Sequence, residues 1–146
     1  MTLRPYRSVL YIPGGRARAL EKARSMPVDS ITFDLEDAVA LEEKASARAT
    51  LVAHLLEGGY GPRSQIIRIN GLDTPWAAED IAAIAEVRPE AVLLPKVDNA
   101  EMISELGAVM GRYEGFENTK IWAMMETPRG ILKAAEIADA PRMGGA

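Results

Sequence analysis

Short apolar runs alternate along the chain with longer segments in which apolar residues recur at helical spacing. The short runs predict five strands, at residues 8–12, 30–35, 65–69, 91–94 and 120–125. The longer segments predict amphipathic helices, at residues 17–26, 41–57, 75–87, 99–113 and 128–138. Strands that alternate with helices in this way pair in parallel, so the sequence predicts an α/β fold of five βα units in one domain, residues 1–146.

The charge balance and the lack of cysteine exclude several classes of protein. The 17 Lys and Arg residues against 21 Asp and Glu residues leave a formal net charge of −4, so no basic surface is expected for nucleic acid or an anionic membrane. Without cysteine there is no disulfide, no thiolate zinc site and no cysteine nucleophile. The first apolar run, of about five residues, is much shorter than the roughly 20 that span a bilayer, so a soluble, cytoplasmic protein is expected.

Polar residues follow the predicted strands at their carboxyl ends, the edge at which parallel α/β proteins bind ligands. They are Asp34, Glu36, Asp37, Arg68, Asn70, Lys96, Glu126 and the Pro-Gly-Gly-Arg loop of residues 13–16. Carboxylates can hold a divalent cation, and an arginine can bind a carboxylate through two hydrogen bonds. Glycines let the backbone approach an anionic group, although such a loop can also be a plain turn. The sequence therefore predicts a ligand site at this edge.

Several of these residues also have a structural interpretation. Asp34 could pair with a lysine or cap the following helix, whereas Arg68 in a buried parallel strand needs an anionic partner to offset its desolvation, which favours a functional role. Glu126 ends an apolar strand, where a carboxylate requires a cation or a hydrogen-bond donor. Lys96 is either a catalytic amine or an ion-pair partner, and the second role is favoured. The Glu-Glu-Lys run of residues 42–44 predicts a solvated helix face.

Five segments match one family pattern in order along nearly the whole chain: SVLYIPGGRARALEKA, FDLEDAVALEEKASAR, IIRINGLDTPWAAED, AVLLPKVDNAE and MMETPRGILKAAEIA. In these segments the sequence resembles the citrate lyase β-subunit and malyl-CoA lyase family of CoA-ester lyases, within the HpcH/HpaI aldolase superfamily. The resemblance implies a TIM (β/α)8 barrel and dependence on Mg2+. It also implies cleavage or formation of the carbon–carbon bond between a CoA thioester and a small oxo acid, as in citryl-CoA or malyl-CoA.

The resemblance further implies roles for single residues. Arg68 corresponds to the arginine that binds the oxo-acid carboxylate, and Glu126 to the first of two carboxylate ligands of Mg2+. Glu36 and Asp37 match an acidic pair that organises the water shell of the metal. The residues that match positions near the phosphates and adenine of CoA, or that lie in the adjoining loop, are Tyr11, Gly14, Arg16 and Lys22. Catalysis would then combine a Lewis-acid metal with a carboxylate oriented by Arg68.

The length of the chain departs from that family. A TIM barrel has eight βα units and typically about 250 residues, whereas five units are predicted here. The family's second metal ligand and its general-base segment correspond to positions beyond Ala146. We therefore expect the N-terminal part of a barrel, with open edges that favour association, and little lyase activity from residues 1–146 alone. Relatives in this family usually assemble as trimers or hexamers, so a homo-oligomer is expected.

Two other interpretations compete with a lyase. Five βα units are also the natural size of a flavodoxin-like, doubly wound domain, which could be a Mg2+-binding signalling module. A receiver of that kind would carry acids after its first strand and an aspartate after the third, whereas here the acids follow the second strand and Arg68 ends the third. The other alternative is a catalytically silent half-barrel that binds a partner or an acyl carrier.

Overall fold

The computed structural model describes residues 5–146, which contain one sheet of six parallel strands. The strands are β1 Val9–Pro13, β2 Ser30–Asp34, β3 Ser64–Arg68, β4 Ala91–Leu94, β5 Lys120–Ala123 and β6 Met143–Gly145. All five predicted strands are present, although β5 ends earlier than expected, at Ala123. β6 was not predicted, because its sequence Met-Gly-Gly has no β-branched or aromatic residue to indicate a strand.

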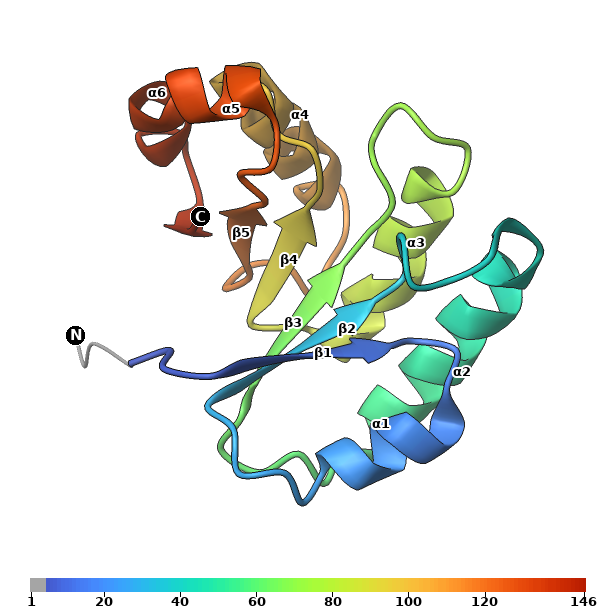
Figure 1. Cartoon of the computed structure of the whole chain (residues 1–146). Helices are drawn as coiled ribbons and strands as arrows, with labels where there is room; N and C mark the ends of the chain where they lie inside the picture. The colour runs from blue at the N-terminus through green and yellow to red at the C-terminus, as the bar shows by residue number, and fades with distance from the viewer. Residues whose placement is uncertain (1–4) are drawn as a thin grey trace.

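Helices connect successive strands (Figure 1). They are α1 Ala17–Ala23, η1 Leu41–Glu43, α2 Lys44–Glu57, α3 Ala77–Ile84, η2 Ala85–Val87, α4 Ala100–Met110, α5 Pro128–Leu132 and α6 Ala134–Ala138. Asn99 Oδ1 accepts a backbone N–H of α4 at 3.0 Å, and Thr127 Oγ1 accepts one of α5 at 3.0 Å, so side chains cap both helices. The helix predicted at residues 128–138 is divided at Lys133. Within residues 5–146, no helix has the length and apolar character needed to cross a membrane.

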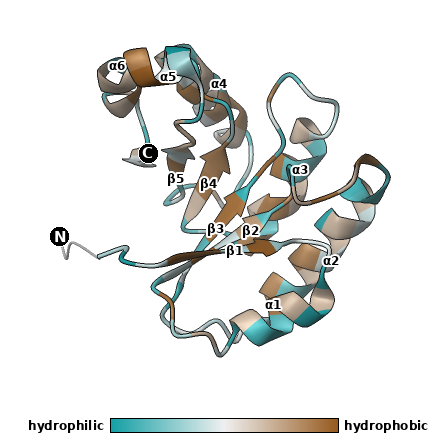
Figure 2. Ribbon diagram, viewed as in Figure 1, coloured by the Kyte–Doolittle hydropathy of each residue, from teal (hydrophilic) through white to brown (hydrophobic). Residues whose placement is uncertain are grey.

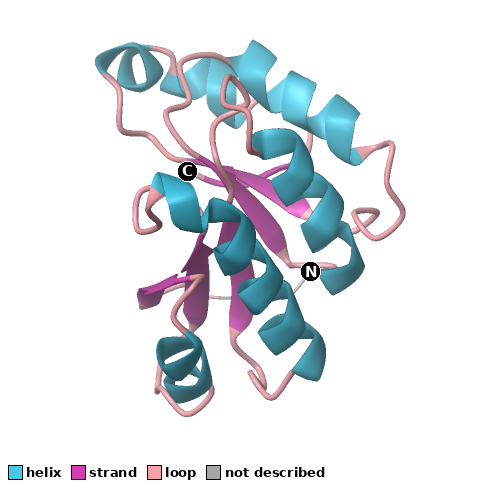
Figure 3. Cartoon of the chain, turned by 90° about the vertical axis from the view of Figure 1, so that its right-hand side faces the viewer, coloured by secondary structure: helices cyan, strands magenta, loops and turns pink. Residues whose placement is uncertain are grey.

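The order of the strands decides between the two predicted arrangements of βα units. A doubly wound sheet changes direction at a switch point and carries helices on both faces. Here the order is β1-β2-β3-β4-β5-β6, and the longer helices cross one face of the sheet, in front of the strands in Figure 3. The flavodoxin-like alternative is therefore wrong, and the predicted parallel α/β sheet is confirmed.

The face of the sheet beneath the helices, called the helix-covered face, holds the main core. Strand residues such as Ile31, Phe33 and Ile67 pack there with helix residues such as Leu51 and Ile81, and all five are essentially inaccessible to solvent. Figure 2 shows hydrophobic residues concentrated in the central strands, whereas the helices carry both hydrophobic and hydrophilic residues. Burial of these side chains is the main contribution to the stability of the fold.

The opposite face, called the helix-free face, holds a smaller apolar cluster. Ile66, Ala91 and Leu93 form it, and the partly buried Trp122 and Met124 pack against them. Because side chains alternate along a strand, Asp34 and Arg68 at the carboxyl ends of β2 and β3 point to this same side. The helix-free face is therefore the one that positions the predicted site.

Candidate functional site

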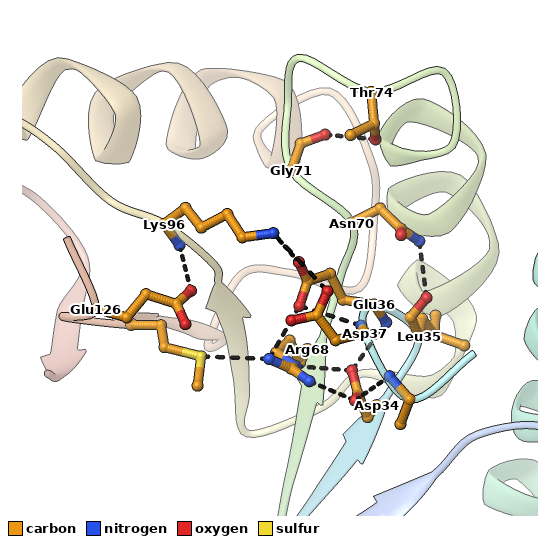
Figure 4. Close-up of polar contacts among 12 residues, drawn as sticks. Asp34, Leu35, Glu36, Asp37, Arg68, Asn70, Gly71, Thr74, Lys96 and Glu126 are labelled. Carbon is orange, nitrogen blue, oxygen red and sulfur yellow. Dashed lines mark hydrogen bonds and ion pairs between the residues drawn. The ribbon is translucent and has the colours of Figure 1, made fainter. Parts of the chain in front are cut away.

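A buried ion pair joins the carboxyl ends of β2 and β3. Asp34 and Arg68 are register partners, and the guanidinium donates from Nε to Asp34 Oδ1 at 2.7 Å and from Nη2 to Asp34 Oδ2 at 2.5 Å (Figure 4). Burial lowers the pKa of Arg68, but the hydrogen bonds and charge of Asp34 and two neighbouring acids outweigh it, so this pKa is raised. Asp34 also accepts the backbone N–H groups of Glu36 and Ala38, at 2.8 and 3.1 Å. The anionic partner that the sequence required for Arg68 is therefore Asp34.

Glu36 connects this ion pair to a second cation. Its buried carboxylate forms an ion pair with Arg68, Oε2 to Nη1 at 2.9 Å, and accepts a hydrogen bond from Lys96 Nζ through Oε1 at 2.7 Å. The neighbouring Asp37 is exposed, and its Oδ1 lies 3.8 Å from the same ammonium. The hydrogen bond to Glu36 is the largest of several effects that raise the pKa of Lys96. The predicted ion-pair role of Lys96 is confirmed.

Glu126 reaches the same group from the segment that follows β5. Since β5 ends at Ala123, the Glu126 side chain is exposed rather than enclosed within an apolar strand. Its Oε1 accepts the backbone N–H of Lys96 at 2.8 Å. The donor that the sequence required for this carboxylate is therefore the main chain after β4. Four predicted residues, Glu36, Asp37, Arg68 and Glu126, are thus brought together around Lys96 (Figure 4).

Lys44 is a site residue that the sequence analysis placed wrongly, on a solvated helix face. It is buried, and its Nζ donates to the carbonyl oxygens of Leu35 at 2.9 Å and Glu36 at 2.6 Å. Burial lowers the pKa of Lys44, and nearby carboxylates offset this only in part. Helical spacing was the signal that could have located it, because Lys44, Arg48 and Leu51 recur at intervals of four and three and all lie on the buried side of α2. Lys44 fixes the backbone that presents the acidic pair.

A second buried network supports the loop after β3. Asn70 donates from its backbone N and from Nδ2 to Asp80 Oδ2, at 3.0 and 2.7 Å, and from Nδ2 to the carbonyl of Leu35 at 3.0 Å. Arg48 Nε donates to the other oxygen of Asp80 at 2.8 Å. Sequence reasoning singled out Asn70 but not its partners, since Asp80 and Arg48 lie in helices with ordinary surface patterns. The network joins the segments after β2 and β3.

A cleft of about 650 Å3 opens beside the cluster. Its wall includes Glu36, Asp37 and Lys96, but neither Arg68 nor Glu126. The charged residues that line it are Glu36, Asp37, Asp73, Asp98, Glu105, Lys44 and Lys96. Because carboxylates outnumber ammonium groups, the cleft suits a cation or an uncharged chain better than the phosphates of a nucleotide.

The residues predicted to lie near CoA are arranged along the first βα unit. The Tyr11 ring centroid is 5.7 Å from the Arg68 guanidinium, so this residue adjoins the cluster. Gly14 is buried, its N–H donates to the carbonyl of Asp34 at 2.8 Å, and a Cβ there would lie 2.9 Å from a Leu35 methyl. Arg16 and Lys22 are exposed at the start and in the last turn of α1, outside the cleft.

The donor chemistry fits a hard divalent cation that keeps much of its water. Glu126 binds the Lys96 N–H through Oε1, which leaves Oε2 for a ligand, and Glu36 and Asp37 add carboxylate oxygens nearby. In the part of the chain from residue 5 onward, no three Asp, Glu, His or Cys side chains are grouped closely enough to enclose a metal. Mg2+ takes one or two protein carboxylates and several waters, so this arrangement is compatible with it and not with an enclosed zinc site.

Comparisons with known proteins agree with the resemblance found in the five segments. A model of the HpcH/HpaI aldolase/citrate lyase family matches residues 7–146. A (3S)-malyl-CoA thioesterase of Cereibacter sphaeroides (strain KD131 / KCTC 12085) is 49% identical over 141 residues, which cover 97% of this chain and 47% of that protein. The citrate lyase subunit beta of Escherichia coli (strain K12) is 37% identical over 142 residues, which cover 94% of this chain and 47% of that protein. The chain spans about half the length of these curated relatives.

A solved structure shows the same similarity in three dimensions. The protein CitE from Mycobacterium tuberculosis, in complex with magnesium, acetoacetate and coenzyme A, superposes with a TM-score of 0.74 at 31% sequence identity. The match covers 94% of this chain and 46% of that one. The parallel α/β arrangement described above is therefore shared with a protein that binds a metal, an oxo acid and a CoA group.

Proposed function

The chain belongs to the HpcH/HpaI aldolase/citrate lyase family, and on this premise we propose that it contributes the Mg2+-binding edge of an enzyme acting on the CoA thioester of a 3-hydroxy acid, such as citryl-CoA or malyl-CoA. The proposed reaction cleaves or forms a carbon–carbon bond, with an acetyl-CoA-type thioester and a small oxo acid as the two fragments. The observation that carries this proposal is the placement of Glu36, Asp37 and Glu126 along one residue, Lys96, beside the buried Arg68.

The metal would be held at the exposed carboxylate of Glu126, with Glu36 and Asp37 bound to waters of its shell. Those two acids are held close to their places, because Glu36 is fixed by Arg68 and the backbone around it by Lys44. Bound Mg2+ would supply a Lewis acid for the carbonyl of the oxo acid. Support comes from the relative solved with magnesium, acetoacetate and coenzyme A.

Arg68 would orient the carboxylate of the oxo acid. Its guanidinium already makes two hydrogen bonds to Asp34, one ion pair to Glu36 and a 3.5 Å contact with Met124 Sδ. A guanidinium has five N–H donors, so one remains for a substrate. Because two carboxylates fix the group in advance, little ordering would be needed when the substrate arrives.

The CoA moiety would lie along the first βα unit rather than in the acidic cleft. The exposed cations of Arg16 and Lys22 suit phosphates, and the exposed ring of Tyr11 offers a surface for stacking. Gly14 would contribute by letting the loop pack closely against β2, since its N–H already donates a hydrogen bond to the carbonyl of Asp34.

The sheet also supports a barrel as the complete fold. Sequential parallel strands with helices on one face are the arrangement in the wall of a (β/α)8 barrel, whose interior the helix-free face would line. Residues 1–146 would then be the N-terminal part of a single barrel domain. Assembly as a homotrimer or hexamer, a cytoplasmic location, and low activity of these residues alone stay predictions.

Thioester hydrolysis is a second candidate, favoured by one observation. The relative with 49% identity is a (3S)-malyl-CoA thioesterase. In that reaction water attacks the thioester carbonyl and releases free CoA thiol, whereas carbon–carbon cleavage leaves the thioester bond intact. Both reactions would use the same acidic edge, so the products must distinguish them.

A product assay separates the two reactions. The protein is incubated with Mg2+ and malyl-CoA or citryl-CoA, and both oxo acid and free thiol are measured. Oxo acid without thiol indicates the lyase, and thiol without oxo acid indicates the thioesterase. Because low activity is predicted for residues 1–146 alone, the absence of both products would contradict both candidates only if the rest of the barrel is present in the assay.

A binding experiment tests the site itself. Calorimetry with Mg2+ and an oxo acid should show at least a tenfold weaker Kd for Mg2+ in Glu126→Gln, a change of about 1.4 kcal/mol, and weaker oxo-acid binding in Arg68→Ala. Glu136→Gln is the matched control, since Glu136 is exposed on α6 and its ion pair, to Lys133 at 3.8 Å, lies outside the site. Unchanged binding in both site variants would remove these residues from the site.

A further inference from the structure

Lys96 touches all three carboxylates of the proposed metal site. Its ammonium lies 2.7 Å from Glu36 Oε1 and 3.8 Å from Asp37 Oδ1, and its backbone N–H donates to Glu126 Oε1 at 2.8 Å. Figure 4 shows the side chain extending from the end of β4 across the group toward Glu36. A positive charge therefore already lies against the acidic pair Glu36 and Asp37, while Glu126 is held by the main chain of the same residue.

The backbone at Lys96 is specialised for this position. Its φ is +52°, in the left-handed region, which non-glycine residues adopt infrequently. Pro95 precedes it. In this conformation the backbone N–H of Lys96 donates to Glu126, while the Lys96 side chain reaches Glu36. The side chain is nonetheless 60% exposed, so its path to solvent and to the cleft that it lines is open.

An ammonium and a divalent cation compete for these carboxylates. Both are attracted to the charge of Glu36 and Asp37, and two cations only a few ångströms apart repel each other even at the effective dielectric constant of a protein surface. Arg68 cannot be the group that leaves, because it is buried and bonded to Asp34 through two nitrogens. Lys96 can leave, because its own side chain is 60% exposed, although Glu36 is buried, and its backbone bond to Glu126 does not depend on the side chain.

We propose that Lys96 is a built-in competitor for the metal: its ammonium neutralises the acidic group while no metal is bound and must move away when a divalent cation binds there. This inference rests on the proposed function, since it takes Glu126, Glu36 and Asp37 as the metal site. It makes Lys96 a positioning residue that sets the affinity for the cation, and it assigns no chemical step to the amine.

The test is calorimetric titration with Mg2+ alone, on wild type, Lys96→Met and Lys96→Arg. Lys96→Met keeps the backbone and the approximate length of the side chain but removes the charge, so Mg2+ should bind roughly fivefold more tightly, as expected when a partly exposed ion pair no longer opposes binding. Lys96→Arg keeps the charge and should bind no more tightly than wild type. Lys133→Met is the control, because that partly exposed lysine forms an ion pair with Glu136, away from the site, and should leave the affinity unchanged. Lys96→Gln replaces Lys96→Met if the latter does not fold.

The outcomes separate this inference from the proposed function. Equal or weaker Mg2+ binding in Lys96→Met, together with loss of binding in Glu126→Gln, would overturn the competitor role and leave the metal site in place. Tighter binding in both Lys96→Met and Lys96→Arg would also contradict it, because the charge would then not be the cause. Absence of Mg2+ binding in wild type and all variants would overturn both.

Discussion

Alternate residues of the same strands meet two different environments. In β2, Ile31 and Phe33 pack beneath the helices, whereas Thr32 and Asp34 face the opposite side. The helix-covered face is mostly apolar and holds most of the core, while the helix-free face combines a small apolar cluster with a buried ion pair at its carboxyl edge. The two-residue period of a strand thus lets one segment contribute to stability on one side and to chemistry on the other.

The largest difference between the faces should appear on aromatic truncation. Phe33→Ala removes a fully buried ring whose centroid lies 5.2 Å from that of Tyr60, and we expect a loss of about 3 to 5 kcal/mol in the free energy of unfolding. Tyr11→Ala on the helix-free face removes a ring that is 45% exposed and stacks on Arg68, and should cost about 1 kcal/mol. Urea unfolding measures both. Equal losses would mean that the helix-free face contributes as much packing as the core.

A smaller effect tests whether the ion pair on the helix-free face also supports the fold. Asp34→Asn weakens charge-assisted bonds to Arg68 inside the protein, and we expect a loss of about 2 kcal/mol. The matched control is Asp37→Asn, since Asp37 is 67% exposed and should change stability by no more than about 0.5 kcal/mol. Urea unfolding of the two variants and wild type measures both changes in the free energy of unfolding. A control as costly as Asp34→Asn would show that burial does not distinguish these two acids.

The smallest effect concerns the amino end of the sheet, away from the site. Hydrogen bonds from Arg7 are the main cause that lowers the pKa of Asp29 from its ordinary value of 3.8 to about 2. A carboxylate with a depressed folded-state pKa stabilises the protein above its unfolded-state pKa, and this contribution disappears as the pH falls from about 4 through about 2. Wild type should therefore lose more stability than Asp29→Asn over that interval. Parallel pH profiles of the two proteins would refute the coupling.

Site residues could be predicted from the sequence where a strand end specified them. Arg68, Glu36, Asp37 and Glu126 follow or end predicted strands, and parallel strands bring their carboxyl ends to one edge, so the convergence of these four was foreseeable. The partners of these residues could not be predicted from the sequence. Asp34 is the bidentate partner of Arg68 only because β2 and β3 are adjacent and in register, a pairing that joins residues 34 positions apart.

Lys44 and Lys96 show the same limit of prediction from sequence: neither residue's contacts could be read from its own segment. In the sequence Lys44 belongs to a run of charges, yet the packing of α2 against the sheet buries its ammonium beneath the acidic loop. Lys96 was predicted as an ion-pair partner, but no local pattern revealed its left-handed backbone or its contact with three carboxylates from two other segments. Local patterns describe one segment at a time, whereas both roles depend on neighbours far away in the chain.

The sequence by itself determined the alternation of strands and helices, the parallel α/β class and the family, because hydrophobic periodicity and ordered motifs are local properties of the chain. Only the tertiary structure decided the sequential strand order, the division between a helix-covered and a helix-free face, and the cation that each carboxylate meets. The physical reason is that a charge inside a protein is stable only with a partner at contact distance, and which groups reach contact is set by how the strands pair across the sheet.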